Sequence, residues 1–198
     1  MPAINNFLIW NSSGILPPVK PERLGNSNER SPYQITLSDF VERFALSQKR
    51  IKILEGFLAF RSELHKLEIT QGFQWLNGSF LEDIEFLENR SPRDLDVVTF
   101  YKLPTDETQE TLIQKNEKIF NTTYLKSTFA VDGYFVMLGY PVDAGEIETI
   151  TYWYSMWSHR RDGLWKGFVK IDLDPSQDTK AKEIIKKTIK EVSNDKSL

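Results

Sequence analysis

The segment from Asp94 to Phe100, DLDVVTF, constrains the fold of this chain more than any other stretch. Its β-branched and aromatic residues from Val97 onward favour a strand. Residues two apart on a strand point to the same face, so Asp94 and Asp96 are predicted to present their carboxylates side by side. Such a pair repels itself unless a cation lies between the two groups. Mg²⁺ suits this role, because it is usually held by one or two carboxylates together with substrate phosphates.

A second predicted strand and a turn precede this acidic segment. Phe73 to Leu76 favour a short buried strand, which Asn77-Gly78-Ser79 would end. Glycine at such a turn lets backbone N–H groups approach a ligand closely. A helix is expected over residues 80–87, and it would place Ser79 at a helix N-terminus, where phosphate binds readily. The alternative is that Gly78 is an ordinary turn residue.

The composition favours a single domain of ordinary type, since 40% of the 198 residues are hydrophobic and 27% are charged. Cysteine is absent, which excludes disulfides and thiolate chemistry and is compatible with a reducing cytosol. The two histidines, His65 and His159, lie far apart in the sequence, so a closed zinc site is not expected.

The charge and the apolar pattern bear on partners and location. A net charge of −3 argues against broad, salt-driven nucleic-acid binding, although basic residues cluster in 43–52, 159–161 and 180–190. The first residues lack the pattern of a signal peptide, and no apolar run approaches the ~20 residues of a membrane span. A cytoplasmic protein without a membrane partner is therefore predicted.

The chain is predicted to comprise an irregular N-terminal arm, residues 1–34, and one domain, residues 35–198. The arm is rich in Pro, Gly, Asn and Ser, yet its apolar residues indicate that it packs. Apolar periodicity and capping signals in the domain favour helices over residues 37–46, 48–66, 104–120, 146–157 and 176–192. Further strands are expected over residues 128–138 and 165–173. These elements predict an α/β (α+β) fold in which helices flank a small mixed sheet.

The acidic segment and the turn together resemble the signature of the nucleotidyltransferase superfamily, which has the DNA polymerase β-like fold. The signature is an apolar residue, Gly-Ser, a spacer and Asp-apolar-Asp-apolar, and its matches here are Leu76, Gly78, Ser79, Asp94, Leu95, Asp96 and Val97. The resemblance implies that Gly78 and Ser79 hold a nucleoside triphosphate while Asp94 and Asp96 bind Mg²⁺ or Mn²⁺. A wider likeness to small bacterial nucleotidyltransferase-like proteins rests on residues 14–18 and on Lys166-Gly167.

The resemblance implies transfer of a nucleoside monophosphate from a nucleoside triphosphate to an RNA, protein or small-molecule acceptor. Small members of the superfamily resemble toxins of toxin–antitoxin or phage-defence systems, which implies a protein partner such as an antitoxin. One alternative is a catalytically inactive protein of this fold that binds nucleotide or a protein partner. The long spacer, residues 80–93, favours that alternative. Another is a structural interaction protein that uses an aromatic helix.

Asp132 is the third expected carboxylate. The superfamily places a further acid on a neighbouring strand, and Asp132 interrupts an otherwise apolar run, where an unpaired charge is costly. The alternative is that Asp132 starts a hairpin turn with Gly133. For Asp94 and Asp96, the alternative is two solvent-facing acids at the entry to a strand. Glu82, Asp83 and Glu85 are expected to be solvated helix positions, and the alternative, which the long spacer allows, is that Asp83 serves as a substitute ligand.

Basic and aromatic side chains complete the set of candidates. Nucleotidyl transfer needs cations near the polyphosphate, and the candidates are Lys126, Arg160, Arg161 and Lys166. Each of them can also be an ordinary surface charge. Aromatic residues of the predicted helix, Tyr152, Trp153, Tyr154 and Trp157, can either stack on a base or pack in the core. His65 is expected on a helix surface.

Overall fold

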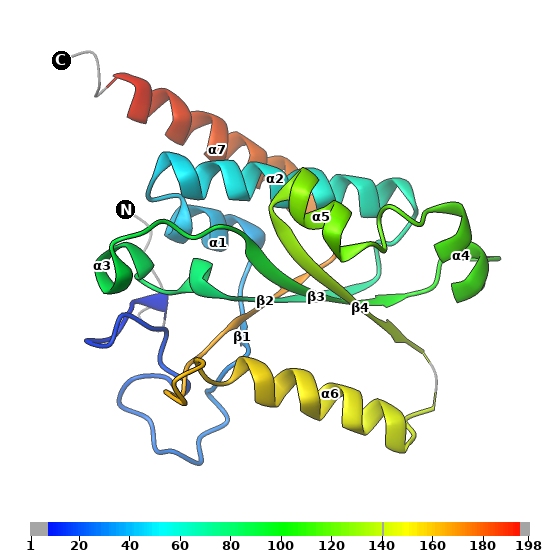
Figure 1. Cartoon of the computed structure of the whole chain (residues 1–198), viewed down its shortest axis with the longest axis horizontal. Coiled ribbons are helices and arrows are strands. Elements are labelled where there is room, and N and C mark those ends of the chain that lie inside the picture. The colour runs from blue at the N-terminus through cyan, green and yellow to red at the C-terminus, as the bar shows by residue number, and fades with distance from the viewer. Residues whose placement is uncertain (1–7, 140, 195–198) are drawn as a thin grey trace.

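The computed structural model describes residues 8–139 and 141–194, and within these ranges the chain forms a five-stranded mixed sheet flanked by helices (Figure 1). The α/β fold class is therefore as predicted. The strand order is β1-β5-β2-β3-β4. The strands are β1 (Tyr33–Gln34), β2 (Gly72–Asn77), β3 (Leu95–Lys102), β4 (Val131–Leu138) and β5 (Val169–Asp172).

The directions of the central strands gather the predicted site residues at one edge of the sheet. β3 runs parallel to β4 and antiparallel to β2. The starts of β3 and β4 and the end of β2 therefore meet at the same edge. Asp94 and Asp96 lie at the start of β3, Asp132 lies at the start of β4, and Gly78 follows β2.

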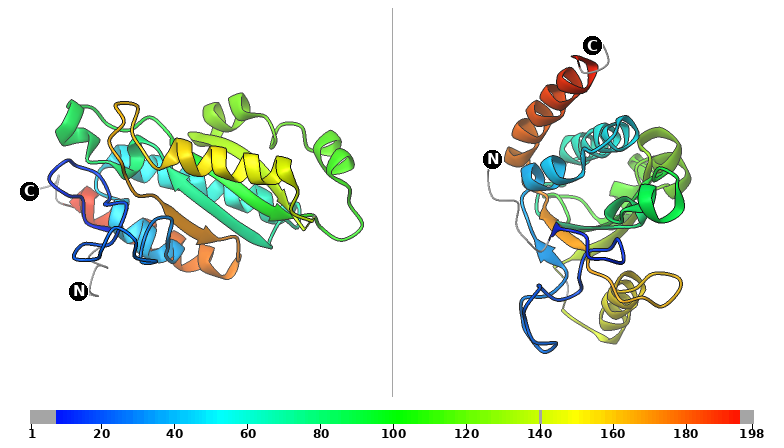
Figure 2. Two further views of the ribbon diagram at one scale, coloured as in Figure 1. Left: turned by 90° about the horizontal axis from the view of Figure 1, so that it is seen from below. Right: turned by 90° about the vertical axis from the view of Figure 1, so that its left-hand side faces the viewer.

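Helices cover both faces of the sheet unequally. One side carries α1 (Leu37–Phe44), α2 (Gln48–Lys66), α5 (Thr122–Phe129) and α7 (Ser176–Asn194). The other side is covered by α6 (Ala144–Trp157) (Figures 1 and 2). The connections contain the 3-10 helix η2 (Ser79–Leu81) and the short helices α3 (Ile84–Glu88) and α4 (Gln109–Lys115). None of the described helices is long and apolar enough to cross a membrane.

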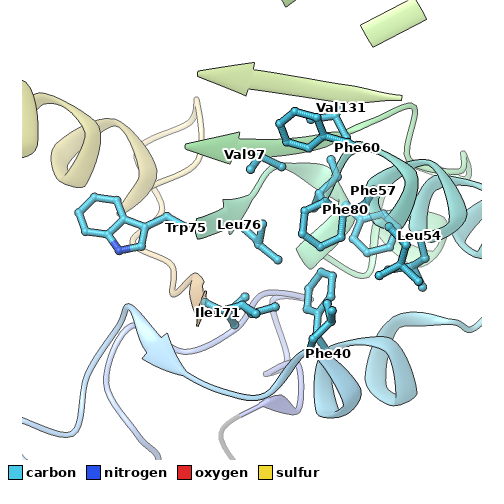
Figure 3. Packing of buried hydrophobic residues seen from close by; sticks show 14 of the residues in the cluster. Phe40, Leu54, Phe57, Phe60, Trp75, Leu76, Phe80, Val97, Val131 and Ile171 are labelled. Atoms are coloured by element: carbon cyan, nitrogen blue, oxygen red, sulfur yellow. The ribbon is translucent and has the colours of Figure 1, made fainter. Parts of the chain in front are cut away.

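The main core lies between the sheet and α2. Alternate strand residues such as Leu76, Val97 and Val131 point to this side, where they join the rings of Phe57 and Phe60 (Figure 3). Fully burying one such aromatic or aliphatic side chain stabilises the fold by about 1.5–3 kcal/mol. A smaller aromatic cluster covers the opposite face, built from Trp75, Phe100, Tyr154, Trp157 and Phe168.

A buried hydrogen-bond network of Arg61, Asp178, Gln74 and Thr99 crosses the main core. The guanidinium of Arg61, on α2, donates to Oδ1 of Asp178, on α7, from Nε (3.0 Å) and Nη2 (2.8 Å). Its Nη1 donates to Oε1 of Gln74, on β2 (2.8 Å), and Gln74 donates in turn to Thr99 Oγ1, on β3 (3.1 Å). One arginine thus ties α7 and α2 to the two central strands.

The sequence predicted α2, α6 and α7 within one or two residues of their ends, but it missed α5. A strand was expected from Thr128, whereas α5 continues to Phe129 and β4 begins at Val131. The side chain of Asn121 caps α5 by accepting from the N–H of Tyr124 (2.9 Å). Ala130 adopts a left-handed conformation (φ 53°) that ends the helix and turns the chain into β4.

Two other predicted elements are shorter than expected. The helix predicted over residues 104–120 is limited to α4, and the strand predicted from Trp165 starts only at Val169. The predicted N-terminal arm packs against the domain, since Leu8, Ile15 and Leu16 are buried. Its last two residues form β1 beside β5. Residues 1–7 of the arm lie outside the described residues.

Gly56 allows α2 to approach α5 closely. A Cβ atom at this position would lie 2.1 Å from the carbonyl oxygen of Phe129, a backbone atom that cannot rotate away. We expect Gly56→Ala to destabilise the protein by about 1–3 kcal/mol in urea denaturation, because the helices must move apart. In an unhindered helix, the same change stabilises by about 1 kcal/mol. The control is Gly145→Ala, at an exposed position of α6. A Gly56→Ala protein as stable as the wild type would contradict the prediction.

Candidate functional site

The three predicted carboxylates lie together on the sheet face that α6 covers. The strand register pairs Asp96 with Asp132 on β4 and with Asn77 on β2. Paired residues on neighbouring strands point to the same face. The ammonium of Lys126 lies 2.8 Å from Oδ2 of Asp94 and 2.8 Å from Oδ2 of Asp132, which links the remaining acid to the same place. The hairpin alternative for Asp132 is wrong, because Asp132 lies inside the continuous strand β4.

Asp96 is a buried acid with charged neighbours. Burial, and then the nearby charges of Asp94 and Asp132, raise the pKa of its carboxyl group to about 6, although Lys166 and Lys126 oppose this rise. Within the described part of the chain, Lys126 pairs with the other two acids and not with Asp96. A buried acid with a raised pKa and specific charged neighbours is a mark of functional sites.

The Gly78-Ser79 turn lies against Asp96. Gly78 has a positive φ of 84°, and a Cβ atom there would lie 2.6 Å from Oδ2 of Asp96, so only glycine fits without strain. Ser79 does not begin the expected helix over residues 80–87. It begins η2, a single 3-10 turn that ends at Leu81, and α3 follows only from Ile84. The prediction of a helix N-terminus at Ser79 that binds phosphate is therefore wrong. The turn is linked to the acids only through the contact of Gly78 with Asp96.

Two residues that the sequence did not single out hold the loop after this turn. Arg50, fully buried at the start of α2, donates to the carbonyls of Phe80 (2.6 Å) and Glu82 (2.7 Å). The indole of Trp10 donates to the carbonyl of Leu81 (2.7 Å). All three carbonyls are thus turned toward α2 and the N-terminal arm. In the sequence, the signal for Arg50 is its position next to the apolar stripe of the helix predicted over residues 48–66.

Lys166 is held in a buried ion pair. Its Nζ lies 2.5 Å from Oε1 of Glu82, and Arg160 lies 3.6 Å from the other oxygen of that carboxylate. Glu82 is therefore not the solvated helix position that was expected. The reason is that η2 ends before it and Glu82 adopts an extended conformation. Lys166 contributes positive charge near Asp96, while its ammonium is occupied by Glu82.

The remaining candidates lie in different surroundings. Arg161 is exposed in the loop after α6. Trp157 is buried and packs against Phe168, whereas Trp153 packs against Tyr134 with the two rings tilted and 4.6 Å between their centroids. Burial raises the pKa of the Tyr134 hydroxyl, and the nearby Asp132 raises it further. His65 is mostly buried rather than on a surface. Its Nε2 lies 3.1 Å from the carbonyl oxygen of Leu173, and its Nδ1 lies 3.6 Å from Oδ2 of Asp178.

The donor set fits a hard divalent cation. Carboxylate oxygens are the ligands that Mg²⁺ and Mn²⁺ prefer. A positive charge already lies between Asp94 and Asp132, namely the Lys126 ammonium. Among residues 8–139 and 141–194, no group of three or more His, Cys, Asp or Glu side chains is arranged as a metal site. The lysine therefore occupies a place where the chemistry of the neighbouring acids suits a metal ion.

Comparison with known proteins identifies a family. Searches of curated proteins and of solved structures gave no significant match. A family model described as a family of unknown function, DUF6932, matches residues 8–172, a span that includes the three acids, the Gly78 turn and both lysines. The chain therefore belongs to the DUF6932 family.

Proposed function

We propose that this protein is a metal-dependent nucleotidyltransferase, which moves a nucleoside monophosphate from a nucleoside triphosphate to an acceptor. The observation that carries the proposal is the placement of Asp94, Asp96 and Asp132 on one sheet face beside the Gly78 turn. The resemblance of this segment to the nucleotidyltransferase signature supports the same assignment.

Each side chain has a role in the proposed reaction. Asp94, Asp96 and Asp132 would hold Mg²⁺ or Mn²⁺, which when bound neutralises the polyphosphate and stabilises charge on the leaving pyrophosphate. Gly78 and Ser79 bind the terminal phosphates through backbone N–H groups and a hydroxyl. The acceptor hydroxyl attacks the α-phosphorus while Asp132 accepts its proton, and the bond to pyrophosphate breaks. The charge of Lys166, fixed by Glu82, supports the phosphates from a distance.

The acceptor in this proposal is an RNA end, a protein hydroxyl or a small molecule. The proposed setting is the cytoplasm, where the protein acts as a toxin or phage-defence component and is restrained by a partner such as an antitoxin. The acceptor classes and the toxin or phage-defence role follow from the resemblance to small nucleotidyltransferases, whereas the cytoplasmic setting follows from the sequence, which lacks cysteine. Comparing RNA, protein and metabolite fractions of a cell extract as acceptors of a labelled nucleotide tests the first.

A second candidate function is favoured by one observation. Lys126 already neutralises Asp94 and Asp132 without a metal ion, as expected if this were an inactive nucleotidyltransferase fold that binds nucleotide or a protein partner. Such a protein would bind a nucleoside triphosphate or a protein partner and transfer nothing.

Thermal melts and a transfer assay distinguish the two candidates. We expect Mg²⁺ together with a nucleoside triphosphate to raise the melting temperature more than either alone, as joint binding to the native state requires. Incubation with each of the α-³²P-labelled ribonucleoside triphosphates and a cell extract should then label an acceptor. A thermal shift without labelling supports the inactive candidate in its nucleotide-binding form. The absence of any shift contradicts both the enzyme and that form, and leaves only an inactive fold that binds a protein partner.

A further inference from the structure

Lys126 is placed at the acids by the way α5 ends. It lies in the last turn of this helix, and the left-handed Ala130 then reverses the chain into β4. This turn brings the Lys126 ammonium to Asp132, six residues further along, and to Asp94 at the entry to β3. Both N–O distances are 2.8 Å, so one ammonium bridges two strands.

The lysine is the exposed partner of this bridge. Its side chain is 51% exposed, whereas the side chains of Asp94 and Asp132 are 19% and 21% exposed. A lysine has a flexible four-carbon stem and a single charge that can find another partner by rotation. The two acids are fixed by their positions at the starts of neighbouring strands. Any exchange of cations here therefore moves Lys126 and leaves the carboxylates in place.

We infer that Lys126 is an internal competitor of the divalent cation and a switchable ligand of the nucleotide phosphates. This inference rests on the proposed function and assigns its regulation. An ammonium within 2.8 Å of both acids and a divalent cation bound by the same oxygens exclude each other, because they share ligands and repel. The cation must displace Lys126, and the displaced ammonium then lies within reach of any polyphosphate bound beside Asp96.

The competition couples the two ligands of the site. Metal alone must break both ion pairs of Lys126 without giving the lysine a new partner, so its affinity is reduced. A triphosphate supplies that partner, so metal and nucleotide should each strengthen the binding of the other by the same factor. The device would keep the site closed by its own lysine until a metal–nucleotide complex arrives.

Binding of Mn²⁺, followed by electron paramagnetic resonance without turnover, tests the inference. We expect Lys126→Met to bind Mn²⁺ about fivefold more tightly than the wild type, the effect of removing a partly exposed competing ion pair. A non-hydrolysable triphosphate analogue should increase Mn²⁺ affinity in the wild type and do so less in Lys126→Met. The matched control is Lys118→Met, which removes an exposed lysine between α4 and α5 and should leave Mn²⁺ binding unchanged.

The outcomes separate this inference from the proposed function. Equal or weaker Mn²⁺ binding by Lys126→Met, in a protein where the wild type binds the ion, overturns the competition and leaves the metal site standing. A lack of Mn²⁺ binding in wild type and variant alike rejects the metal site, and the inference falls with it. Lys126→Gln, which keeps a polar side chain, repeats the test if Lys126→Met does not fold. Circular dichroism of each variant verifies folding.

Discussion

Asp96→Asn is expected to be more stable than the wild type in the absence of metal at about pH 8. The folded protein raises the pKa of Asp96 from its ordinary value of 3.8 to about 6. Folding therefore favours the protonated carboxyl group, and stability falls as the pH rises from the lower of these values to the higher. At one pKa unit per about 1.4 kcal/mol, the cost of keeping Asp96 ionised is about 3 kcal/mol. Asparagine keeps the shape of the side chain and carries no such cost.

The measurement is urea denaturation of both proteins across a pH series. The difference in unfolding free energy should be largest at about pH 8 and should shrink toward about pH 5, as the wild type gains its proton. Asp172→Asn is a suitable control, because Asp172 lies on the same sheet face two strands away. A difference that does not depend on pH would show that burial of the Asp96 charge is not its cause.

The same variant should abolish nucleotidyl transfer, because asparagine lacks the charge that the proposed metal site requires. Its melting temperature should no longer rise further when Mg²⁺ is added together with a nucleoside triphosphate. Asp172→Asn should keep both the transfer and the thermal shift. Transfer at the wild-type rate by Asp96→Asn would refute the assigned metal ligand.

Arg61→Met is expected to cause a large loss of unfolding free energy, the second large effect. This change leaves the buried carboxylate of Asp178 without its arginine partner, with His65 3.6 Å away, and removes a donor from Gln74. Removing one member of a buried charged pair typically costs about 3–5 kcal/mol. The control on the same helix is Lys66→Met, which breaks an exposed ion pair with Glu63 and should cost less than about 1 kcal/mol.

Urea denaturation of single and double variants measures this effect. Because Arg61 and Asp178 interact directly, the double variant Arg61→Met/Asp178→Asn should lose less stability than the sum of the two single losses. Two results would contradict this expectation: losses of unfolding free energy that add exactly in the double variant, or an Arg61→Met loss as small as that of Lys66→Met. Either would show that the pairing of Arg61 with Asp178 in the buried hydrogen-bond network does not stabilise the fold.

Local sequence patterns predicted the elements that depend on local signals. The apolar stripe of α2 and the two-residue spacing of Asp94 and Asp96 are properties of short segments, so helix and strand could be predicted from them. α5 could not, because Thr122, Thr123 and Thr128 favour strands, and the helix depends on its Asn121 cap and on packing against β4.

The partners of buried charges could not be predicted for a different reason. Arg50 is held by the carbonyls of Phe80 and Glu82, and Lys166 by Glu82, residues far away in the sequence. A single sequence gives the charge of such a residue but not the direction in which the fold turns it. Lys126 was predicted as a phosphate ligand on the same basis, and only the structure places it between two of the acids.

The buried hydrogen-bond network also determines how far the protein can be shortened. The DUF6932 match ends at residue 172, before α7 begins at Ser176. A fragment of residues 8–172 would retain the buried guanidinium of Arg61 and lose Asp178, the carboxylate that neutralises it. Recombinant fragments meant to preserve the acid cluster should therefore extend through α7.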